Sequence, residues 1–264
     1  MESIKAELER LSASGFKEIV LTGINLSCYD DNGKKLIDVI EMADNVNGIE
    51  RIRLGSLDPE VVTEDFVERL GKVKKICPHF HFSLQSGCDK TLKAMNRHYT
   101  SDEYYEKCQL IRKYIDNPAF TTDVIVGFPG ETEEDFEELK EFVRKVRFDR
   151  MGAFAYSEEE GTYSAEHYED EIPFETKQAR LDKLMALQQK ISADLAAQKI
   201  GKIFKVIIDR SEGEYYIGRT EFDSPEVDPE VLIPVSEGTL SLGTFYEVKI
   251  TDADDFDLYG TRMF

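Results

Sequence analysis

The sequence is poor in cysteine, and the spacing of its few cysteines excludes two common uses. Only four occur in 264 residues, and they lie 49, 11 and 20 residues apart. This spacing matches neither the Cys-x-x-Cys pairs of zinc and redox sites nor the disulfide framework of a small secreted protein. We therefore expect free thiols, mostly buried, and no metal site. The four residues are Cys28, Cys77, Cys88 and Cys108.

Long apolar runs and an excess of positive charge are also missing. No stretch approaches 18 uncharged apolar residues, which argues against a membrane-spanning helix, and residues 1–10 read as an amphipathic helix rather than a signal peptide. The 53 acidic and 33 basic residues give a net charge of −20. Such a charge repels nucleic acid and favours basic partners, although it also serves simply to keep a protein in solution. We expect a soluble cytoplasmic protein without membrane contact.

Up to about residue 156, short β-branched runs alternate with stretches of helical periodicity. This alternation predicts parallel strands joined by right-handed crossovers. Five strands are too few for a closed eight-stranded barrel, so an open doubly wound sheet and an incomplete (β/α) barrel remain as alternatives. The expected strands are Glu18–Thr22, Glu50–Gly55, His79–Leu84, Ala119–Val126 and Arg150–Ala155. Helix starts are expected at Asp58 before Pro59, at Thr100 with Glu103, and at Thr132 with its acidic first turn.

The pattern changes from Pro173 onward. Leucines and isoleucines three and four residues apart predict a long amphipathic helix that stops near Gly201. Short alternating runs separated by turns follow, and they predict a small five-stranded antiparallel β-barrel. Residues 203–264 hold 14 acidic and five basic side chains, so this barrel is itself strongly negative. We expect three parts, namely a barrel-like unit over 1–172, a connector helix over 173–201 and the small barrel over 202–264. The expected barrel strands are Ile203–Asp209, Glu214–Arg219, Val231–Val235, Phe245–Thr251 and Phe256–Thr261.

A glycine-rich turn between a predicted strand and a predicted helix is the strongest local signal of a binding site. In Thr122–Thr132, backbone N–H groups around Gly127 and Gly130 would face a carboxylate or phosphate, and Asp123 would meet an amine or hydroxyl. An ordinary turn, in which glycine supplies only backbone freedom, explains the local sequence equally well.

Other strand ends carry polar residues as well. Gln85 and Ser86 follow the third strand, and Arg97 has the planar fork that pairs with carboxylates. Gly23, Asn25 and Ser56 close two further strands. Each alone reads as a surface residue, but the carboxyl ends of parallel strands share one edge, so together they predict a site there.

Cys77, His79 and His81 alternate, which would place them on one face of a straight strand as metal ligands. Pro78 argues against a regular strand at this point, and no fourth ligand is near in sequence. We therefore interpret the two histidines as packed or hydrogen-bonded side chains.

Five motifs, in order and spacing, resemble the radical-SAM methylthiotransferases over nearly the whole chain. They are Leu21-Thr-Gly-Ile-Asn25, Leu84-Gln-Ser-Gly87, Met95-Asn-Arg97, Thr122–Thr132 and Tyr156–Thr162. The resemblance implies a six-unit partial (β/α) barrel that carries S-adenosylmethionine, followed by a terminal barrel called the TRAM domain, and so favours the incomplete barrel. It also implies that the strand-end residues line the S-adenosylmethionine site. These residues are Gly23, Asn25, Ser56, Gln85, Ser86, Arg97, Asp123 and Gly127.

The enzymes of this family replace a C–H hydrogen with a methylthio group. The resemblance implies a four-iron four-sulfur cluster that cleaves S-adenosylmethionine and a second cluster that delivers sulfur, both held by cysteine thiolates. The radical-generating cluster is held by Cys-x-x-x-Cys-x-x-Cys after the first barrel strand of the family. Because this motif is absent, we expect residue 1 to correspond to a point inside the barrel, and we expect these residues alone to be unable to form the radical.

Two substrates remain open. The first half, especially His79–Arg97 with Tyr99 and Thr100, resembles the branch that modifies threonylcarbamoyladenosine in tRNA. The sequence from about Gly130 onward resembles the branch that methylthiolates an aspartate of the twelfth small-subunit ribosomal protein. The negative terminal barrel favours the basic ribosomal protein over tRNA. A catalytically inactive fragment or binding module is a further alternative.

Overall fold

A computed structural model describes residues 1–225 and 227–263 of the chain. Its first half contains two sets of parallel strands, in the orders β1-β4 and β5-β6-β7. Bridges from Ile52 to Ile76 and from Leu57 to Phe82 join the two sets into one curved row. The predicted incomplete barrel is therefore confirmed. The strands are β1 (Glu18–Leu21), β4 (Arg51–Leu54), β5 (His79–His81), β6 (Ala119–Val126) and β7 (Arg150–Ala155).

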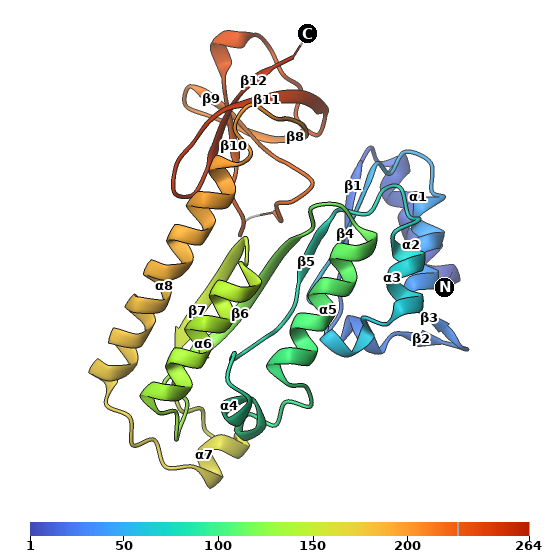
Figure 1. The fold of residues 1–264 in the computed structure, drawn as a ribbon. Coiled ribbons are helices and arrows are strands. Elements are labelled where there is room, and N and C mark those ends of the chain that lie inside the picture. The colour runs from blue at the N-terminus through green and yellow to red at the C-terminus, as the bar shows by residue number, and fades with distance from the viewer. Residues whose placement is uncertain (226, 264) are drawn as a thin grey trace.

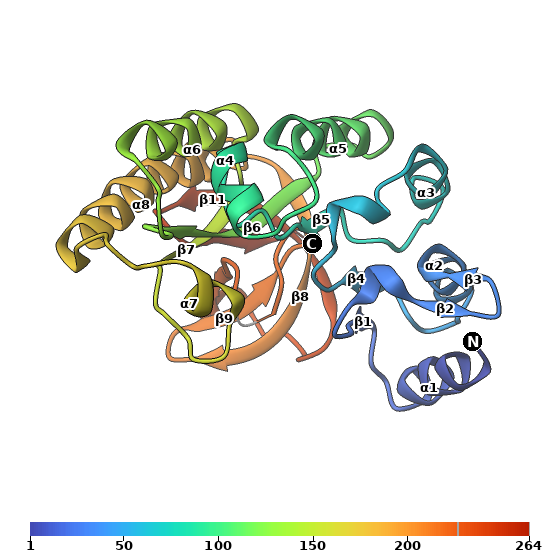
Figure 2. The same ribbon diagram turned by 90° about the horizontal axis from the view of Figure 1, so that it is seen from below.

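Helices cover one side of this row, as Figure 2 shows for α2, α3, α5 and α6. The helices are α1 (Glu2–Ala13), α2 (Leu36–Asp44), α3 (Glu64–Leu70), α4 (Asp89–Ala94), α5 (Ser101–Tyr114), α6 (Glu133–Val146) and α7 (Tyr163–His167). A short hairpin of β2 (Asp30–Asp31) and β3 (Lys34–Lys35) precedes α2. Among the described helices, none has the length and apolar character needed to cross a membrane.

Local sequence explains most of the helix starts. Thr100 and Thr132 each form a capping box, with Glu103 and with Asp135, as their spacing predicts. Asp58 caps only a 3-10 turn, η2 (Pro59–Val61), and the α-helix begins later, after Thr63. The expected α-helix start at Asp58 is thus wrong by one turn, because Val62 keeps a non-helical backbone between the two elements.

The core lies between the strands and the helices. Phe80 of β5, Phe82 just after it and Phe120 of β6 are buried. Tyr104 of α5 packs edge-on against Phe82 at a ring distance of 6.1 Å. The Tyr104 hydroxyl donates a hydrogen bond to the Phe82 carbonyl at 3.1 Å, so this buried polar atom is satisfied. The aromatic core fixes β5 and β6, on which several of the predicted site residues lie.

The long helix α8 (Phe174–Ala197) runs beside β7 and leads into a closed five-stranded barrel, drawn at the top of Figure 1. The barrel order is β10-β12-β11-β8-β9, and the pair β10-β12 is parallel. An odd number of strands cannot close a ring with every neighbour antiparallel, so one parallel pair is required. The strands are β8 (Ile203–Glu212), β9 (Tyr215–Arg219), β10 (Val231–Pro234), β11 (Phe245–Ala253) and β12 (Leu258–Arg262), with the 3-10 turns η1 (Leu26–Cys28) and η3 (Val235–Glu237) elsewhere in the chain.

The terminal barrel packs against the end of the sheet at which the strands begin. Glu18, at the start of β1, lies between Arg51 and Arg53 of β4 and Arg219 of β9. All four side chains are at most 7% exposed. Burial alone would raise the pKa of Glu18, but the guanidinium groups of Arg53, Arg219 and Arg51 hold it below its ordinary value. The opposite end of the sheet, near α4 and α7 in Figure 1, is left clear of the barrel.

Candidate functional site

A cavity of about 940 Å³, which we call the central cavity, lies on the side of the strands that faces away from the core. Side chains from all five parallel strands line it, together with one face of α8 and two loops of the terminal barrel. Residues 224, 227–229 and 255–257 of these loops line the cavity, Asp228 and Phe256 among them. The cavity is therefore formed jointly by the three parts of the chain.

Asp123, on β6, is one of two predicted site residues, with Ser56, that line this cavity. Its carboxylate is 46% exposed and lies 3.5 Å from Nε2 of His81 on the adjacent strand β5. Thr121 hydrogen-bonds the other ring nitrogen of His81 at 3.0 Å. Gly152 of β7 lies opposite Asp123, and an added Cβ there would be 2.4 Å from Oδ1 of the carboxylate. The neighbouring strands thus leave one side of the Asp123 carboxylate open.

Gln85 adjoins Asp123 through the backbone. Its N–H donates to the Asp123 carbonyl, and its own carbonyl accepts from Ile125, both at 2.9 Å. β5 ends at His81, three residues before the predicted Leu84, but Gln85 again bridges β6 at Val124. The φ of Gln85 is +71°, in the left-handed region. A non-glycine residue in this region is strained, and such strain often accompanies a functional site.

The two predicted serines differ in their surroundings. Ser56 lines the central cavity and is paired with Ser83 through their hydroxyl groups at 3.0 Å, so it faces the same space as Asp123. Ser86 is 1% exposed, and its hydroxyl accepts from the N–H of Cys88 at 3.2 Å. Ser56, Gln85 and Asp123 are brought together, whereas Ser86 supports the start of α4.

The predicted anion-binding turn is already occupied by a side chain of the chain itself. The N–H of Gly127, whose φ is +71°, donates to Oε1 of Glu131 at 2.8 Å. Arg180 of α8 donates to the same oxygen at 2.7 Å. Burial raises the pKa of Glu131 against the opposing effects of Gly127 and Arg180. This buried network joins the turn after β6 to α8. No local pattern signals it, because Arg180 lies 49 residues from Glu131.

Arg97 lies close to the end of β5. The nearby Tyr99 hydroxyl donates hydrogen bonds to the carbonyls of Ser83 and Leu84 at 2.7 and 3.0 Å. Burial raises the pKa of Tyr99 to about 12, although the positive charge of Arg97 opposes this rise. The Nε atom of Arg97 is shielded from solvent and has no hydrogen-bond partner among the described residues. A buried donor without a partner is costly, so this position fits a ligand with a carboxylate.

Gly23 and Asn25 follow β1 and are exposed. The Asn25 side chain accepts from the N–H of Cys28 at 3.2 Å and caps η1. The loop is joined to the end of β4 by Ser27, whose hydroxyl accepts from the N–H of Asp58 at 2.9 Å. The ends of β1 and β4 are thereby held together.

The cysteines are unsuited to an iron–sulfur cluster. Cys28 is exposed, while Cys77, Cys88 and Cys108 are buried at separate places in the fold. Within residues 1–225 and 227–263, no group of three or more potential ligand side chains is placed to hold a metal ion. His79, one of the two histidines considered as ligands, is instead paired with Asp228 at 3.1 Å.

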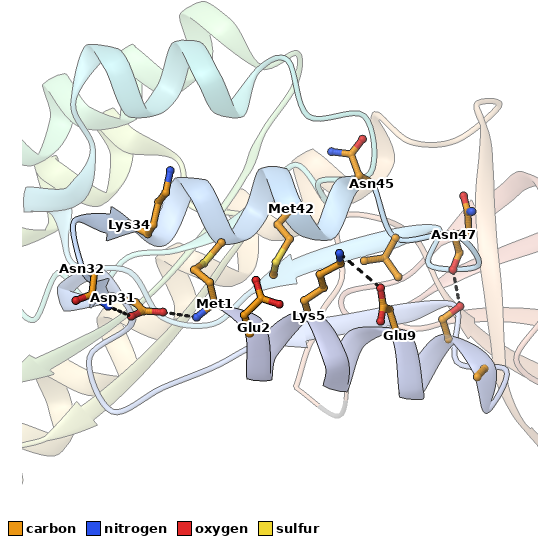
Figure 3. A pocket seen from close by; sticks show the side chains of 13 residues that line it. Met1, Glu2, Lys5, Glu9, Asp31, Asn32, Lys34, Met42, Asn45 and Asn47 are labelled. Atoms are coloured by element: carbon orange, nitrogen blue, oxygen red, sulfur yellow. Dashed lines mark hydrogen bonds and ion pairs between the residues drawn. The ribbon is translucent and has the colours of Figure 1, made fainter.

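A second cavity, of about 1010 Å³, lies between α1 and the region of α2 (Figure 3). Its charged groups are largely paired with one another: the Met1 amino group contacts Asp31, and Lys5 lies 3.9 Å from Glu9. No predicted site residue lines it. The central cavity is therefore the candidate site.

Residues 1–143 match the family model described as the Radical SAM superfamily. The chain belongs to this superfamily. The closed barrel also has a counterpart, because residues 200–263 match the model of the TRAM domain. A radical SAM domain followed by a TRAM domain is the arrangement implied by the sequence motifs.

Similar curated proteins extend the match across the whole chain. Ribosomal protein uS12 methylthiotransferase RimO of Phocaeicola vulgatus is 52% identical over 100% of this radical SAM chain and 62% of its own length. The protein of the same name from Bacteroides thetaiotaomicron is 53% identical, over 98% of this chain and 60% of its own length. The chain thus spans about three-fifths of these relatives.

Among solved structures, coproporphyrinogen III oxidase (HemN) of Escherichia coli, described as a radical SAM enzyme, has a TM-score of 0.58. It is 12% identical, and the match covers 83% of this chain and 59% of the oxidase. At this identity the likeness concerns the fold alone, and it agrees with the partial barrel.

Sequence reasoning missed the part that the terminal barrel plays in the candidate site. Asp228 reaches His79 from a residue 149 positions later in the chain, and no local pattern marks that contact. The interpretation of both histidines as hydrogen-bonded side chains is confirmed, but no local pattern marks Asp123 as the carboxylate beside His81. The contact of His81 with Asp123 follows from the register of β5 on β6, in which His81 faces Thr121.

Proposed function

We propose that the chain forms the S-adenosylmethionine-binding barrel and TRAM domain of a methylthiotransferase that modifies an aspartate of ribosomal protein uS12. The match to two uS12 methylthiotransferases at 52% and 53% identity, over both halves of the chain, carries this proposal. The net charge of −20 supports a basic protein substrate rather than tRNA.

The residues at the strand ends suit an amino-acid-like ligand. Arg97, whose Nε has no hydrogen-bond partner among residues 1–225 and 227–263, would hold the carboxylate of S-adenosylmethionine. The open side of Asp123 would accept hydrogen bonds from the amino group or ribose of this ligand. Ser56 and Gln85 lie beside Asp123 and would orient the ligand further. In this superfamily, S-adenosylmethionine supplies a carbon radical when it is bound and reduced.

The cofactor assignment is tested by isothermal titration calorimetry with S-adenosylmethionine. Arg97→Ala and Asp123→Asn should each weaken binding by about tenfold, because each removes a charged hydrogen-bond partner. Arg10→Ala and Asp116→Ala, at exposed positions, serve as matched controls. Equal affinity in all five proteins would reject the assigned roles.

The substrate is tested by retention of purified uS12 and of tRNA on the immobilised chain. We expect uS12 to be retained and to elute with rising salt, since the attraction is electrostatic. Salt-sensitive retention of tRNA without retention of uS12 would favour the tRNA-modifying alternative.

The cysteine positions bear on activity. Because no three thiols lie together, we propose that residues 1–264 alone do not cleave S-adenosylmethionine. The chain should therefore bind no stoichiometric cluster after incubation with iron and sulfide. Release of 5′-deoxyadenosine by the purified chain would contradict this expectation.

A further inference from the structure

The central cavity carries an excess of negative charge. Five carboxylates line it, against one guanidinium group, that of Arg150. Arg150 donates to the main-chain carbonyls of Asp149 and Phe256 at 2.7 and 3.2 Å rather than to these carboxylates. Within the described residues, none of the five forms an ion pair with a lysine or arginine of the chain. They are Asp123, Asp182, Asp228, Asp255 and Asp257.

Apolar side chains stand beside these carboxylates and are themselves exposed. Met185 of α8 is 38% exposed, Val20 of β1 is 41% exposed, and Phe256 of the terminal barrel is 69% exposed. Asp182, Met185 and Gln189 lie on one face of α8, at a spacing of three and four residues, and all line the cavity. The cavity therefore combines apolar walls with acidic groups.

A buried hydrogen-bond acceptor adds a third feature. His79 lines the cavity, is 2% exposed, and contacts the Asp228 carboxylate through Nε2 at 3.1 Å. In the neutral tautomer that donates from Nε2 to Asp228, Nδ1 carries a lone pair. This atom has no hydrogen-bond partner in the part of the chain that the structure describes. The site thus offers acceptors and calls for a ligand with N–H donors.

We propose that the central cavity binds a lysine or arginine side chain of the polypeptide substrate, entering as an extended segment. The stem of such a side chain packs on apolar surface while its charged head reaches the carboxylates. Phe256 also offers a ring face to a cation. This inference rests on the proposed function in one respect, because it assigns the partner as a basic protein, and it adds the chemistry by which that protein is recognised.

The terminal barrel gains a definite role from this assignment. Asp228, Asp255 and Asp257 belong to its two loops, and the contacts from His79 and Arg150 fix these loops against the starts of β5 and β7. The barrel therefore acts as a wall of the recognition site as well as contributing a negative surface.

The test uses two capped pentapeptides, Gly-Gly-Arg-Gly-Gly and the same peptide with citrulline in place of arginine. Citrulline has nearly the same shape but no charge, so it isolates the cationic head. We expect the arginine peptide to bind the intact chain about tenfold more tightly in calorimetry at low salt. Equal affinities, or no detectable binding of either peptide, would overturn the proposal.

A pair of variants on one helix localises the binding. Asp182→Asn removes a carboxylate from the cavity wall, whereas Asp194→Asn changes an exposed carboxylate that lies 3.5 Å from Arg147 and does not line the cavity. Asp182→Asn should lower the affinity for the arginine peptide by about fivefold, and Asp194→Asn should leave that affinity unchanged. Equal weakening by both would assign the effect to overall charge and reject the site. Circular dichroism confirms that both variants are folded.

The outcome is separable from the proposed function. Peptide binding is measured without S-adenosylmethionine, and the cofactor titration is measured without peptide. Loss of cofactor binding in the unmodified chain would reject the cofactor assignment and leave the peptide result standing. Failure to distinguish arginine from citrulline would reject the recognition site alone.

Discussion

The carboxylate of Glu18 in β1 accepts a hydrogen bond at 2.7 Å from the guanidinium group of Arg219 in β9, across 201 positions of sequence. Arg53 lies 3.3 Å from the same oxygen and Arg51 3.5 Å from the other. This cluster is the main charged contact between the partial barrel and the terminal barrel. Removal of one member of a buried cluster leaves the others uncompensated.

Glu18→Gln should therefore destabilise the chain strongly. Three buried arginines would lose their shared carboxylate, at a cost of about 3–5 kcal/mol in the free energy of unfolding. Urea denaturation followed by tyrosine fluorescence measures the change. Glu9→Gln, on the exposed side of α1, is the control and should change stability by less than about 0.5 kcal/mol. Similar values for the two variants would show that the cluster does not stabilise the fold.

The same carboxylate predicts sensitivity to acid. The folded pKa of Glu18 lies below its ordinary value of 4.5, so its stabilising contribution is complete above that pH and is lost as the pH falls through the lowered pKa. Asp228 follows the same sign: burial would raise its pKa, but the hydrogen bond from His79 holds it below the ordinary value. The urea midpoint should fall steeply below about pH 4.5. Glu18→Gln should flatten that fall, and an unchanged slope would argue against the assignment.

Two glycines in the turn after β6 allow the cost of backbone strain to be measured apart from the cost of a steric clash. Gly127 and Gly130 both have positive φ, at +71° and +80°. A Cβ on Gly127 would lie 2.4 Å from Cγ of Lys177, whereas one on Gly130 would meet nothing within 4 Å. Gly130→Ala should cost about 1 kcal/mol, and Gly127→Ala about 2–3 kcal/mol because overpacking is added to strain. Equal losses in urea denaturation would mean that Lys177 moves aside freely.

Strand β1 has an open edge. The carbonyl of Lys17 accepts from the N–H groups of Glu50 and Arg51, and the carbonyl of Leu21 accepts from that of Gly55. Because the backbone groups of successive strand residues point to opposite sides, the N–H of Val20 points away from β4. Val20→Pro should reduce concentration-dependent self-association in analytical ultracentrifugation with a stability loss under about 1 kcal/mol. Ile19→Pro removes an N–H that faces β4 and should unfold the strand. Equal stability of the Val20→Pro and Ile19→Pro variants would contradict this assignment of the N–H groups in β1.

The thiols should differ sharply in reactivity. Cys28 is exposed, whereas burial raises the pKa of Cys77 to about 11 and that of Cys108 to about 12, and also raises the pKa of Cys88. A disulfide reagent at about pH 8 should modify one thiol quickly and the other three only in denaturant. Cys28→Ser should remove the fast phase. Two or more fast thiols in the native chain would show that the buried sites open readily.

Local patterns predicted the elements well and their long-range contacts poorly. β6 and β7 have the predicted bounds, and for β6 the reason is a run of β-branched residues that ends at Gly127. The capping boxes at Thr100 and Thr132 are encoded within four residues. β5 is shorter than predicted, since its register on β6 becomes irregular between Phe82, which bonds Thr121, and Gln85, which bonds Asp123. The left-handed backbone of Gln85 is likewise not signalled by its residue type. The His79–Asp228 and Gly127–Glu131–Arg180 contacts depend on how distant segments pack.

The order of the elements along the chain has a consequence for synthesis. Glu18, Arg51 and Arg53 are made early, and Arg219 is made 201 residues after Glu18. At about 5–20 residues per second, translation separates the two partners by about 10–40 seconds. During that interval the nascent partial barrel must keep its arginine pair and one glutamate hydrated at the ribosome surface. The contact that allows β1 to bury its charge is therefore completed only when β9 has been made.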